Sequence, residues 1–493
     1  MNLEEAPFNS IRDILLANRD DYGEIYLIGG YVRDYLLHKQ NKDLDFSVTK
    51  NAAKAARSIA DYFGGDFYML DHKRETARAL ISINHMCIVI DVAIISGQNI
   101  FEDLAKRDFT INAMAVDLAD LKKIIDPLNG KTDLMKRQLK PCSESSFSND
   151  PIRTMRAVRF IQSLSLDYDP QVKQAIQNES KNLGSVSGER IQDELCHIFN
   201  LPDIKKTMQL LVEFDIFRQL FPDLIQLQDI PSQPPHVHDA FTHTLRVVEL
   251  TELFLESIEN ANRLIENKFT NDVLIIVRKY KKGLTNFLDE LAGNKISINL
   301  LLILAALYHD SGKPIIEPVE EVGTVKYPNH AEKSADIVLK RMKALTFSNE
   351  EIQFVYSIIR YHMADELRTI GDEKNPYRNI YRYFRKSGYS GVMIGFLHLA
   401  DVIATYEATL PPHRWNTALK SVEKIFDGWF NHYSEVVFPP KLLNGNDLME
   451  KFGLSPGREI GNILERIREE QAAGIILERN AAFIFAEKMI EGI

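Results

Sequence analysis

Strand-like patterning is confined to about the first quarter of this 493-residue chain, and this confinement constrains the fold more than any other feature. Short runs rich in β-branched residues, such as EIYLIGG, DLDFSV and CIVIDVAII, alternate with helical stretches between residues 24 and 126. Beyond residue 148 the apolar residues recur at helical spacing and the strand signals fade. The pattern predicts an α+β chain, with a small mixed β-sheet near the N-terminus followed by helical regions.

Breaks in composition divide the chain further. The prolines of IPSQPPHVHD predict a linker near residues 230–237, and a second proline break occurs at Pro439 and Pro440. A chain of this length is expected to form about three or four domains. We expect these domains at residues 1–140, 141–230, 231–410 and 411–493.

Composition narrows the class of protein. The net charge of -10 means that any contact with nucleic acid requires a local basic patch. The three cysteines form no CxxC pairing, so neither a disulfide framework nor a structural zinc site is indicated. No apolar run is expected to reach the ~18 residues that cross a bilayer. We therefore expect a cytoplasmic protein that has no membrane partner.

Two carboxylates lie one residue apart early in the chain. Asp43 and Asp45 share one face of the predicted strand, with their backbones ~7 Å apart. Such a pair can bridge two divalent ions ~3.5–4 Å apart, as in-line nucleotidyl transfer requires. Gly29 and Gly30 allow phosphate to approach the backbone before a helix N-terminus, and Asp91, in an apolar run, is a candidate third metal ligand. The alternative is a simple glycine turn beside an edge strand with solvated acids.

These features resemble the class II nucleotidyltransferase superfamily, which contains the tRNA CCA-adding enzymes and bacterial poly(A) polymerases. The head motif GGxVRD with DxD matches residues 29–45, and RDFTINAMA, DPLNGKTDL and SGERIQDE follow in family order. The motif that is usually EDxxRxxRAxRF stands as NDPIRTMRAVRF, with Asn149 in place of the glutamate. The resemblance implies a nucleotidyltransferase head, a helical neck and two Mg²⁺ ions held by the strand acids. The implied nucleotide-binding residues are Gly29, Gly30, Arg33, Arg107, Asp150, Arg153, Arg156 and Arg159.

The neck motif suggests how a base is selected. Asp150 and Arg153 lie three residues apart on a predicted helix and share a face. A carboxylate accepts from an exocyclic amine, while a guanidinium donates to a ring nitrogen or carbonyl. Cytosine and adenine both present an amine beside an acceptor, so the pair predicts use of CTP and ATP and rejection of UTP and GTP. Arg156 and Arg159 would face the triphosphate or the RNA backbone, unless this is merely an exposed basic face.

A second group of polar residues lies in the histidine-rich region. His309 and Asp310 end an apolar helical run, where both are costly unless they bind something. Imidazole with carboxylate suits Zn, Mn, Fe, Co or Ni. The arrangement resembles the HD superfamily of metal-dependent phosphohydrolases, in which Lys313 would lie near the phosphate and His330 and His362 would bind a second metal or the substrate. The implied metal ligands are His243, His309, Asp310 and Asp401.

The two resemblances together imply a function. We expect template-independent addition of C and/or A to the tRNA 3′ end from CTP and ATP, and a second activity as an HD phosphohydrolase. The helical tail either grips the tRNA body or serves structural packing alone. The segment between Asp91 and Arg107 is short, with one glycine, as in enzymes that stop after CC, so a product ending mainly in CC is predicted. The basic runs at 278–283 and 382–388 are candidate RNA contacts or solvated faces. A poly(A) polymerase, or an HD phosphohydrolase with a non-catalytic RNA-binding head, is the alternative.

Overall fold

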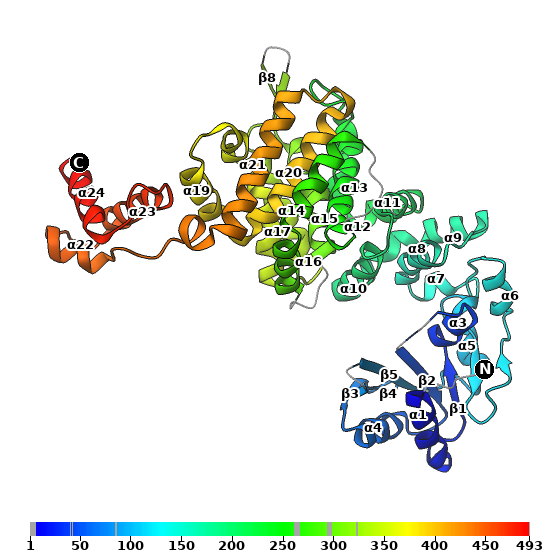
Figure 1. The fold of residues 1–493 in the computed structure, drawn as a ribbon. Coiled ribbons are helices and arrows are strands. Elements are labelled where there is room, and N and C mark those ends of the chain that lie inside the picture. Colours follow the sequence, from blue (N-terminus) through cyan, green and yellow to red (C-terminus); the bar gives the residue numbers. More distant parts are fainter. Residues whose placement is uncertain are drawn as a thin grey trace. The chain divides into compact units, whose positions relative to one another are not determined.

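The computed structural model divides the chain into two compact units, which Figure 1 shows as a sheet-containing part and a helical part. It describes residues 6–39, 41, 43–83, 86–260, 267–292, 298–321 and 324–492, so the expected domain limits at residues 1 and 493 lie outside the described residues. The units are Met1–Val186 with Leu210–Gln219, and Ser187–Gln209 with Leu220–Ile493. The predicted class, a mixed sheet near the N-terminus followed by helices, is confirmed.

A seven-stranded mixed sheet organises the first unit, in the order β3-β4-β5-β2-β1-β6-β7. Strands β2 and β5 are parallel, and all other neighbours are antiparallel. Strand β2, which carries the acid pair, therefore lies inside the sheet, and the edge-strand alternative is excluded. The strands are β1 (Ile25–Ile28), β2 (Asp43–Val48), β3 (Asp66–Asp71), β4 (Thr76–Ile83), β5 (Met86–Ile94), β6 (Ala115–Asp117) and β7 (Ile124–Ile125).

Helix α4 (Ala52–Phe63) covers one face of this sheet. Its buried side chains are mostly alanine, so the helix approaches β4 closely, and alternate β4 residues Ala77, Ala79 and Ile81 are buried. The other helices with residues in this unit are α1 (Ala6–Ala17), α2 (Arg19–Tyr22), α3 (Gly30–Leu36), α5 (Ile100–Ala105), α6 (Gly130–Met135), α7 (Ser146–Asn149), α8 (Ile152–Leu164), α9 (Pro170–Ser180), α11 (Ile204–Glu213) and α12 (Ile216–Leu220).

Aromatic packing fixes helix α8 against the RDFTINAMA segment. Phe109 lies 6.0 Å from Phe147 and 5.7 Å from Phe160, measured between ring centroids. Such edge-to-face pairs add specific geometry to the burial of large apolar surface. The RDFTINAMA motif and the neck motif are thereby packed against each other.

The second unit is a bundle around α15 (Ile298–Tyr308), which is apolar on every side and buried from Leu300 onward. Helices α10, α13, α14, α16 and α17 contact it. The helices around it are α10 (Gly188–Phe199), α13 (Ala240–Glu259), α14 (Lys268–Ala292), α16 (His330–Ala344), α17 (Asn349–Tyr361), α18 (Asp365–Thr369), α19 (Tyr377–Ser387), α20 (Gly391–Tyr406) and α21 (Pro412–Asn431). A two-stranded sheet, β8 (Val319–Glu321) with β9 (Thr324–Lys326), completes this region.

The proline-rich segment at residues 230–237 lies inside the second unit, not between the two units. The amide of Val237 donates to the carbonyl of Thr405 at 3.1 Å. The ring of His236 lies 5.0 Å from that of His243, edge to face. These contacts close the segment onto the helical core, so proline content alone did not mark the boundary between the units.

One stretch, Tyr377–Thr409, is long and apolar enough to cross a membrane by length and composition, contrary to the expectation that no such run exists. It consists of α19 and α20, separated by a turn at Gly388 with φ of 56°. Because 67% of its apolar window is buried inside the protein, the stretch has the character of a core segment.

The tail forms a small cluster of three helices with its own apolar core. The basic run at 382–388, a candidate RNA contact or solvated face, contacts this tail: Arg382 donates two hydrogen bonds to Glu469, and Arg385 pairs with Glu465 at 3.1 Å. The tail helices are α22 (Gly445–Phe452), α23 (Arg458–Ala472) and α24 (Arg479–Glu491).

Candidate functional sites

The acid pair lies next to the glycine turn, as the motif predicts. Ile28, the last residue of β1, pairs with Asp45 of β2, so the turn that follows β1 begins beside that carboxylate. Gly29 has a φ of 71°, a region that L side chains rarely adopt. A Cβ at this position would lie 3.0 Å from Arg107 Nη1 and 3.5 Å from Asp45 Oδ2. The bare backbone thus lets an arginine and a carboxylate meet at the turn.

The electrostatics of this site centre on Asp45. Burial raises the pKa of Asp45 to about 6, against the lowering effect of Arg107, and the neighbouring acids Asp91 and Asp43 raise it further. When burial and neighbouring acids disfavour the charged form of a carboxyl group, a bound cation stabilises that form by replacing the lost hydration. The pair Asp43 and Asp45 is therefore suited to hold divalent cations, with Arg107, 3.5 Å from Asp103, at its edge.

Asp91, the candidate third metal ligand, lies beside Asp45 in the sheet but is already paired with a cation. It faces Asp45 across the parallel strands β2 and β5. Both of its oxygens accept from the guanidinium of Arg78, each at 2.8 Å. Bidentate pairs of this kind fix geometry as well as charge. Arg78 was missed because the pairing of β4 with β5 cannot be read from local periodicity.

The motif arginine Arg33 is engaged within the head. Its guanidinium donates to both oxygens of Asp34 and, through Nη1, to Asn112 Oδ1 at 2.7 Å. Asn112 in turn donates to Asp108, which also accepts two hydrogen bonds from Arg156 of α8. Burial raises the pKa of Asp108, but the Arg156 charge and hydrogen bonds outweigh it and leave the pKa below its usual range. The network ties the glycine-turn helix to the neck.

The predicted base-reading pair lies where α7 ends and α8 begins. Asp150 is extended at the junction, while Arg153 donates to the carbonyls of Arg107 and Lys106 and to Ser146 Oγ. Two of its nitrogens thus already hold the loop that carries Arg107. The side chain of Arg159 lies over the ring of Phe160, at 4.9 Å from its centroid. Base reading by Asp150 and Arg153 stays a prediction.

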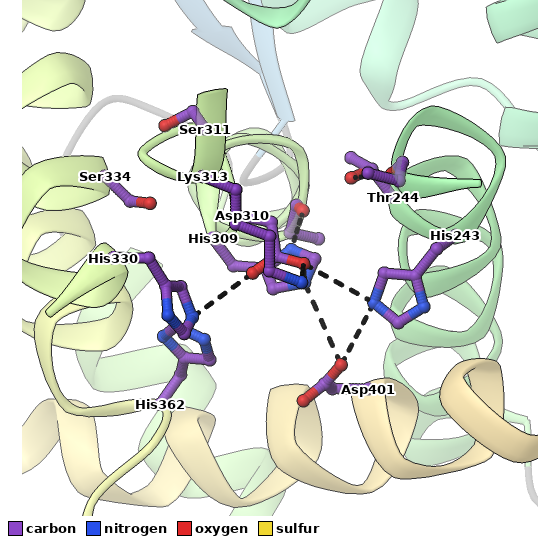
Figure 2. A network of polar contacts seen from close by, with 12 residues as sticks. His243, Thr244, His309, Asp310, Ser311, Lys313, His330, Ser334, His362 and Asp401 are labelled. Carbon is purple, nitrogen blue, oxygen red and sulfur yellow. Dashed lines mark hydrogen bonds and ion pairs between the residues drawn. The ribbon is translucent and has the colours of Figure 1, made fainter. Parts of the chain in front are cut away.

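A second site gathers five helical segments of the bundle. His243 lies on α13 and Asp401 on α20, while His309 and Asp310 follow α15 directly. His330 begins α16 and His362 follows the end of α17. Figure 2 shows all six side chains pointing toward one another. The ligand set that the HD resemblance implied is therefore brought together in space.

Two groups of possible metal ligands share one carboxylate. The first joins His243, His309 and Asp310, and the second joins Asp310, His330 and His362. Asp310 Oδ2 lies 3.3 Å from His309 Nε2, while Asp310 Oδ1 lies 3.3 Å from His330 Nε2. Asp401 Oδ1 closes the first group at 3.1 Å from His243 Nε2. One carboxylate with each oxygen in a different group is suited to bridge two cations.

The donor atoms fit metal ions. Nδ1 of His309, His330 and His362 lies 2.6–2.8 Å from the carbonyl oxygen three residues before each histidine, which leaves Nε2 facing inward. Nδ1 of His243 and Nε2 of His362 are buried without a hydrogen-bond partner among the described residues, while Nε2 of His243 and of His309 face the carboxylates of Asp401 and Asp310. Anchored histidines with inward, unsatisfied nitrogens are typical of metal ligands held by outer partners.

The charges around the site support the same interpretation. Burial raises the pKa of Asp310, but Lys313, 2.6 Å away, and His309 outweigh it and hold the pKa well below its usual range. Burial lowers the pKa of His362 to about 3, so this ring is neutral and able to ligate. His236, which the sequence reasoning did not single out, lies against His243, and burial lowers its pKa to about 4.

Family models match three parts of the chain. Residues 25–140 match the poly A polymerase head domain, and residues 166–227 match the probable RNA- and SrmB-binding site of polymerase A. Residues 240–388 match the HD domain. The order of these matches is the order in which the sequence motifs occur.

Similarity to known proteins extends over nearly the whole chain. It is 25% identical over 475 residues to the A-adding tRNA nucleotidyltransferase of Deinococcus radiodurans, covering 94% of this chain and 95% of that protein. It is 26% identical over 475 residues to the CC-adding tRNA nucleotidyltransferase of Thermus thermophilus, covering 94% and 93%. The fold matches a CCA-adding enzyme solved in complex with ATP, at a TM-score of 0.62 and 19% identity, covering 98% of this chain and 95% of that one. The chain therefore combines matches to a poly A polymerase head domain, an RNA-binding segment of polymerase A and an HD domain, and its similarity to tRNA nucleotidyltransferases extends over nearly its whole length.

Proposed function

We propose that this protein adds C and/or A to the 3′ end of tRNA from CTP and ATP, without a template and with release of diphosphate. The observation that carries the proposal is the meeting of Gly29, Asp45 and Arg107 at the end of β1, beside Asp43. Two relatives, which this chain covers over 95% and 93% of their length, are named tRNA nucleotidyltransferases, and this supports the same substrate class.

In this proposal Asp43 and Asp45 hold two Mg²⁺ ions. When bound, such ions activate the attacking 3′-hydroxyl and neutralise the leaving diphosphate. The turn at Gly29 and Gly30 binds triphosphate oxygens through the backbone, because no side chain there blocks the approach. Arg107 adds positive charge beside Asp45. Arg33, Arg156 and Arg159 are proposed as further nucleotide contacts; in the structure, Arg33 and Arg156 belong to the network that joins the head to the neck.

We propose that Asp150 and Arg153 select the base. The carboxylate accepts from the exocyclic amine of cytosine or adenine, and the guanidinium retains a donor for the neighbouring ring acceptor. Because Arg153 is anchored to the backbone of Lys106 and Arg107, the base reader and the phosphate-binding arginine move as one piece. Such coupling would place the base and the triphosphate in a fixed relation.

The proposed product ends mainly in CC. The segment between Asp91 and Arg107 is tied down: the amide of Ser96 donates to Asp103 at 2.8 Å, and Lys106 Nζ donates to the Ser96 carbonyl at 2.9 Å. Asn99 also caps the N-terminus of α5. A segment held in this way favours one primer position over a switch from C to A.

Incubation with tRNA transcripts that end before CCA, after C and after CC tests these proposals. Addition of two C residues to the first transcript, and little A on the third with ATP in excess, is expected. Efficient addition of A to the third transcript would overturn the CC assignment, and long adenosine tails on unrelated RNA would favour a poly(A) polymerase.

A second activity is proposed for the bundle site. The two ligand groups that share Asp310 support a phosphohydrolase that uses Ni, Mn, Co or Zn. Metal bound there would supply an activated water, and Lys313 would contact the phosphate beside it. Purified protein should contain transition metal and hydrolyse a phosphomonoester or a cyclic phosphodiester. Absence of both metal and hydrolysis would leave the site structural.

Two further proposals concern the whole chain. The helical cluster α22–α24 is proposed to bind the tRNA body, and its separate apolar core is consistent with a distinct module. A cytoplasmic location suits a protein that meets tRNA and nucleotides there. Binding of tRNA by the full chain and by a variant ending at residue 438 would test the tail, since a weaker complex is expected only if the tail contacts tRNA.

A further inference from the structure

One face of the head sheet carries an ordered row of side chains that leads to the catalytic acids. Tyr68 of β3 pairs with Arg78 of β4, Arg78 pairs with Asp91 of β5, and Asp91 pairs with Asp45 of β2. Cross-strand partners point to the same face of a sheet. With strands ~4.8 Å apart, Tyr68 lies about 14 Å from Asp45 along this row.

The outer part of this face is open to solvent. Tyr68 is 49% exposed, and Leu70, which lies at the bulge of β3, is 48% exposed. The opposite face is covered, because Ala77, Ala79 and Ile81 are buried beneath α4. An aromatic ring and an aliphatic side chain are thus presented outward on a rigid strand.

Positive charge lines the end of the same strands. The turn between β3 and β4 exposes His72, Lys73 and Arg74, and Arg74 is 86% exposed. Asp71 Oδ1 accepts from the amides of Lys73 and Arg74, which fixes the shape of the turn. Arg78 lies on the row as well, with Nε and Nη2 paired with the carboxylate of Asp91. Aromatic and cationic side chains on one surface are the combination that binds single-stranded nucleic acid.

We propose that this face binds the single-stranded 3′ end of the tRNA during nucleotide addition. Tyr68 stacks on a base upstream of the reacting nucleotide, and Lys73, Arg74 and Arg78 contact the phosphates. The inference rests on the proposed function, which requires the primer 3′-hydroxyl to lie at Asp43 and Asp45. The row connects that point with the aromatic surface, and the exposed Lys73 and Arg74 beside that surface complement RNA more than an apolar protein partner.

Steady-state kinetics with a tRNA transcript lacking CCA test the inference. Tyr68→Ala should raise the KM for tRNA on the order of tenfold while leaving the KM for CTP unchanged, because stacking of a base is lost. Tyr68→Trp should restore the KM. The matched control is Tyr62→Ala, since Tyr62 is 67% exposed on α4, the helix that covers the opposite face.

A second variant tests the charges. Replacing Lys73 and Arg74 by alanine should make the KM for tRNA less sensitive to salt, with the slope of log KM against log salt falling by about 1. The inference is overturned if Tyr68→Ala matches Tyr62→Ala, or if Tyr68→Ala instead dissociates a dimer seen for the wild type in solution. If the wild-type protein extends no tRNA at all, the proposed function is wrong. If all variants extend tRNA as the wild type does, the proposed function stands and only the binding of the 3′ end by this face is wrong.

Discussion

The two proposed metal sites of this protein would hold divalent cations with different ligands and at different depths in the structure. In the head, Asp43 and Asp45 lie on one strand, and Asp43 is exposed where the strand begins. In the bundle, His243 and Asp401 are 158 residues apart and converge in a buried centre. An open pair of acids suits weakly held Mg²⁺ that arrives with a nucleotide, while buried imidazoles suit a resident transition metal. We therefore expect exchangeable metal at the strand acids and retained metal in the buried centre of the bundle.

The largest effect is expected from the bundle ligands. The double change His309→Ala with Asp310→Ala removes a histidine from one ligand group and the carboxylate shared by both. Bound transition metal and phosphohydrolase activity should fall to background, while addition to tRNA continues. Metal analysis and both assays on one preparation measure this. The matched control His413→Ala, on an exposed residue of α21, should retain metal. Retained metal in the double variant would contradict the proposal that His309 and Asp310 hold the metal.

A smaller effect is expected for base selection in the head. If Arg153 reads the base as proposed, Arg153→Ala removes a charged hydrogen bond to it, at a cost of ~1–3 kcal/mol. Incorporation of UTP or GTP should rise relative to CTP, as measured with each nucleotide alone. An equal loss for all four nucleotides would mean that Arg153 serves only to hold the Arg107 loop.

The smallest effect concerns the free energy of unfolding. The folded-state pKa of Asp45 is about 6, above the ordinary carboxyl value, so the unfolding free energy falls as pH rises from about 4 to 6 and stays low above. In metal-free buffer at pH 8, Asp45→Asn should therefore be more stable than wild type by about 1–2 kcal/mol, after allowance for solvent access. At pH 4 the gain should shrink.

Thermal unfolding with and without Mg²⁺ measures this change. Added Mg²⁺ should stabilise the wild type and leave Asp45→Asn unaffected, because only the carboxylate gains from the ion. Equal stabilisation of both proteins would place the Mg²⁺ elsewhere. The same addition is expected to change the bundle site little, which sharpens the contrast between the two regions.

Much of the architecture was predictable because it depends on local patterns. The strands of the head alternate in a two-residue period, and the motif spacing put Asp43 and Asp45 on one face without knowledge of their neighbours. The pairing of Asp91 with Arg78 was not predictable, since it depends on which strands lie side by side. The sequence suggested a third metal ligand at Asp91, where the structure has an ion pair with Arg78.

In the bundle, contacts between residues far apart in the sequence were even less predictable from local patterns. The six ligands come from segments spread over residues 243–401, and only resemblance to a known family predicted that they meet. His236 was missed because it precedes the helix and its contact with His243 depends on how the proline-rich segment folds back. The basic run at 382–388 was ambiguous for a related reason: its partners Glu465 and Glu469 lie some eighty residues later.

The most direct test of the account measures both activities in one variant. Wild type and the Asp43→Ala, Asp45→Ala double variant are each incubated with a tRNA transcript that ends before CCA, with CTP, ATP and Mg²⁺. We expect that the wild type extends the transcript, that the double variant does not, and that both keep the same transition-metal content and hydrolysis in the bundle. Extension of tRNA by the double variant would contradict the assignment of nucleotide addition to the strand acids.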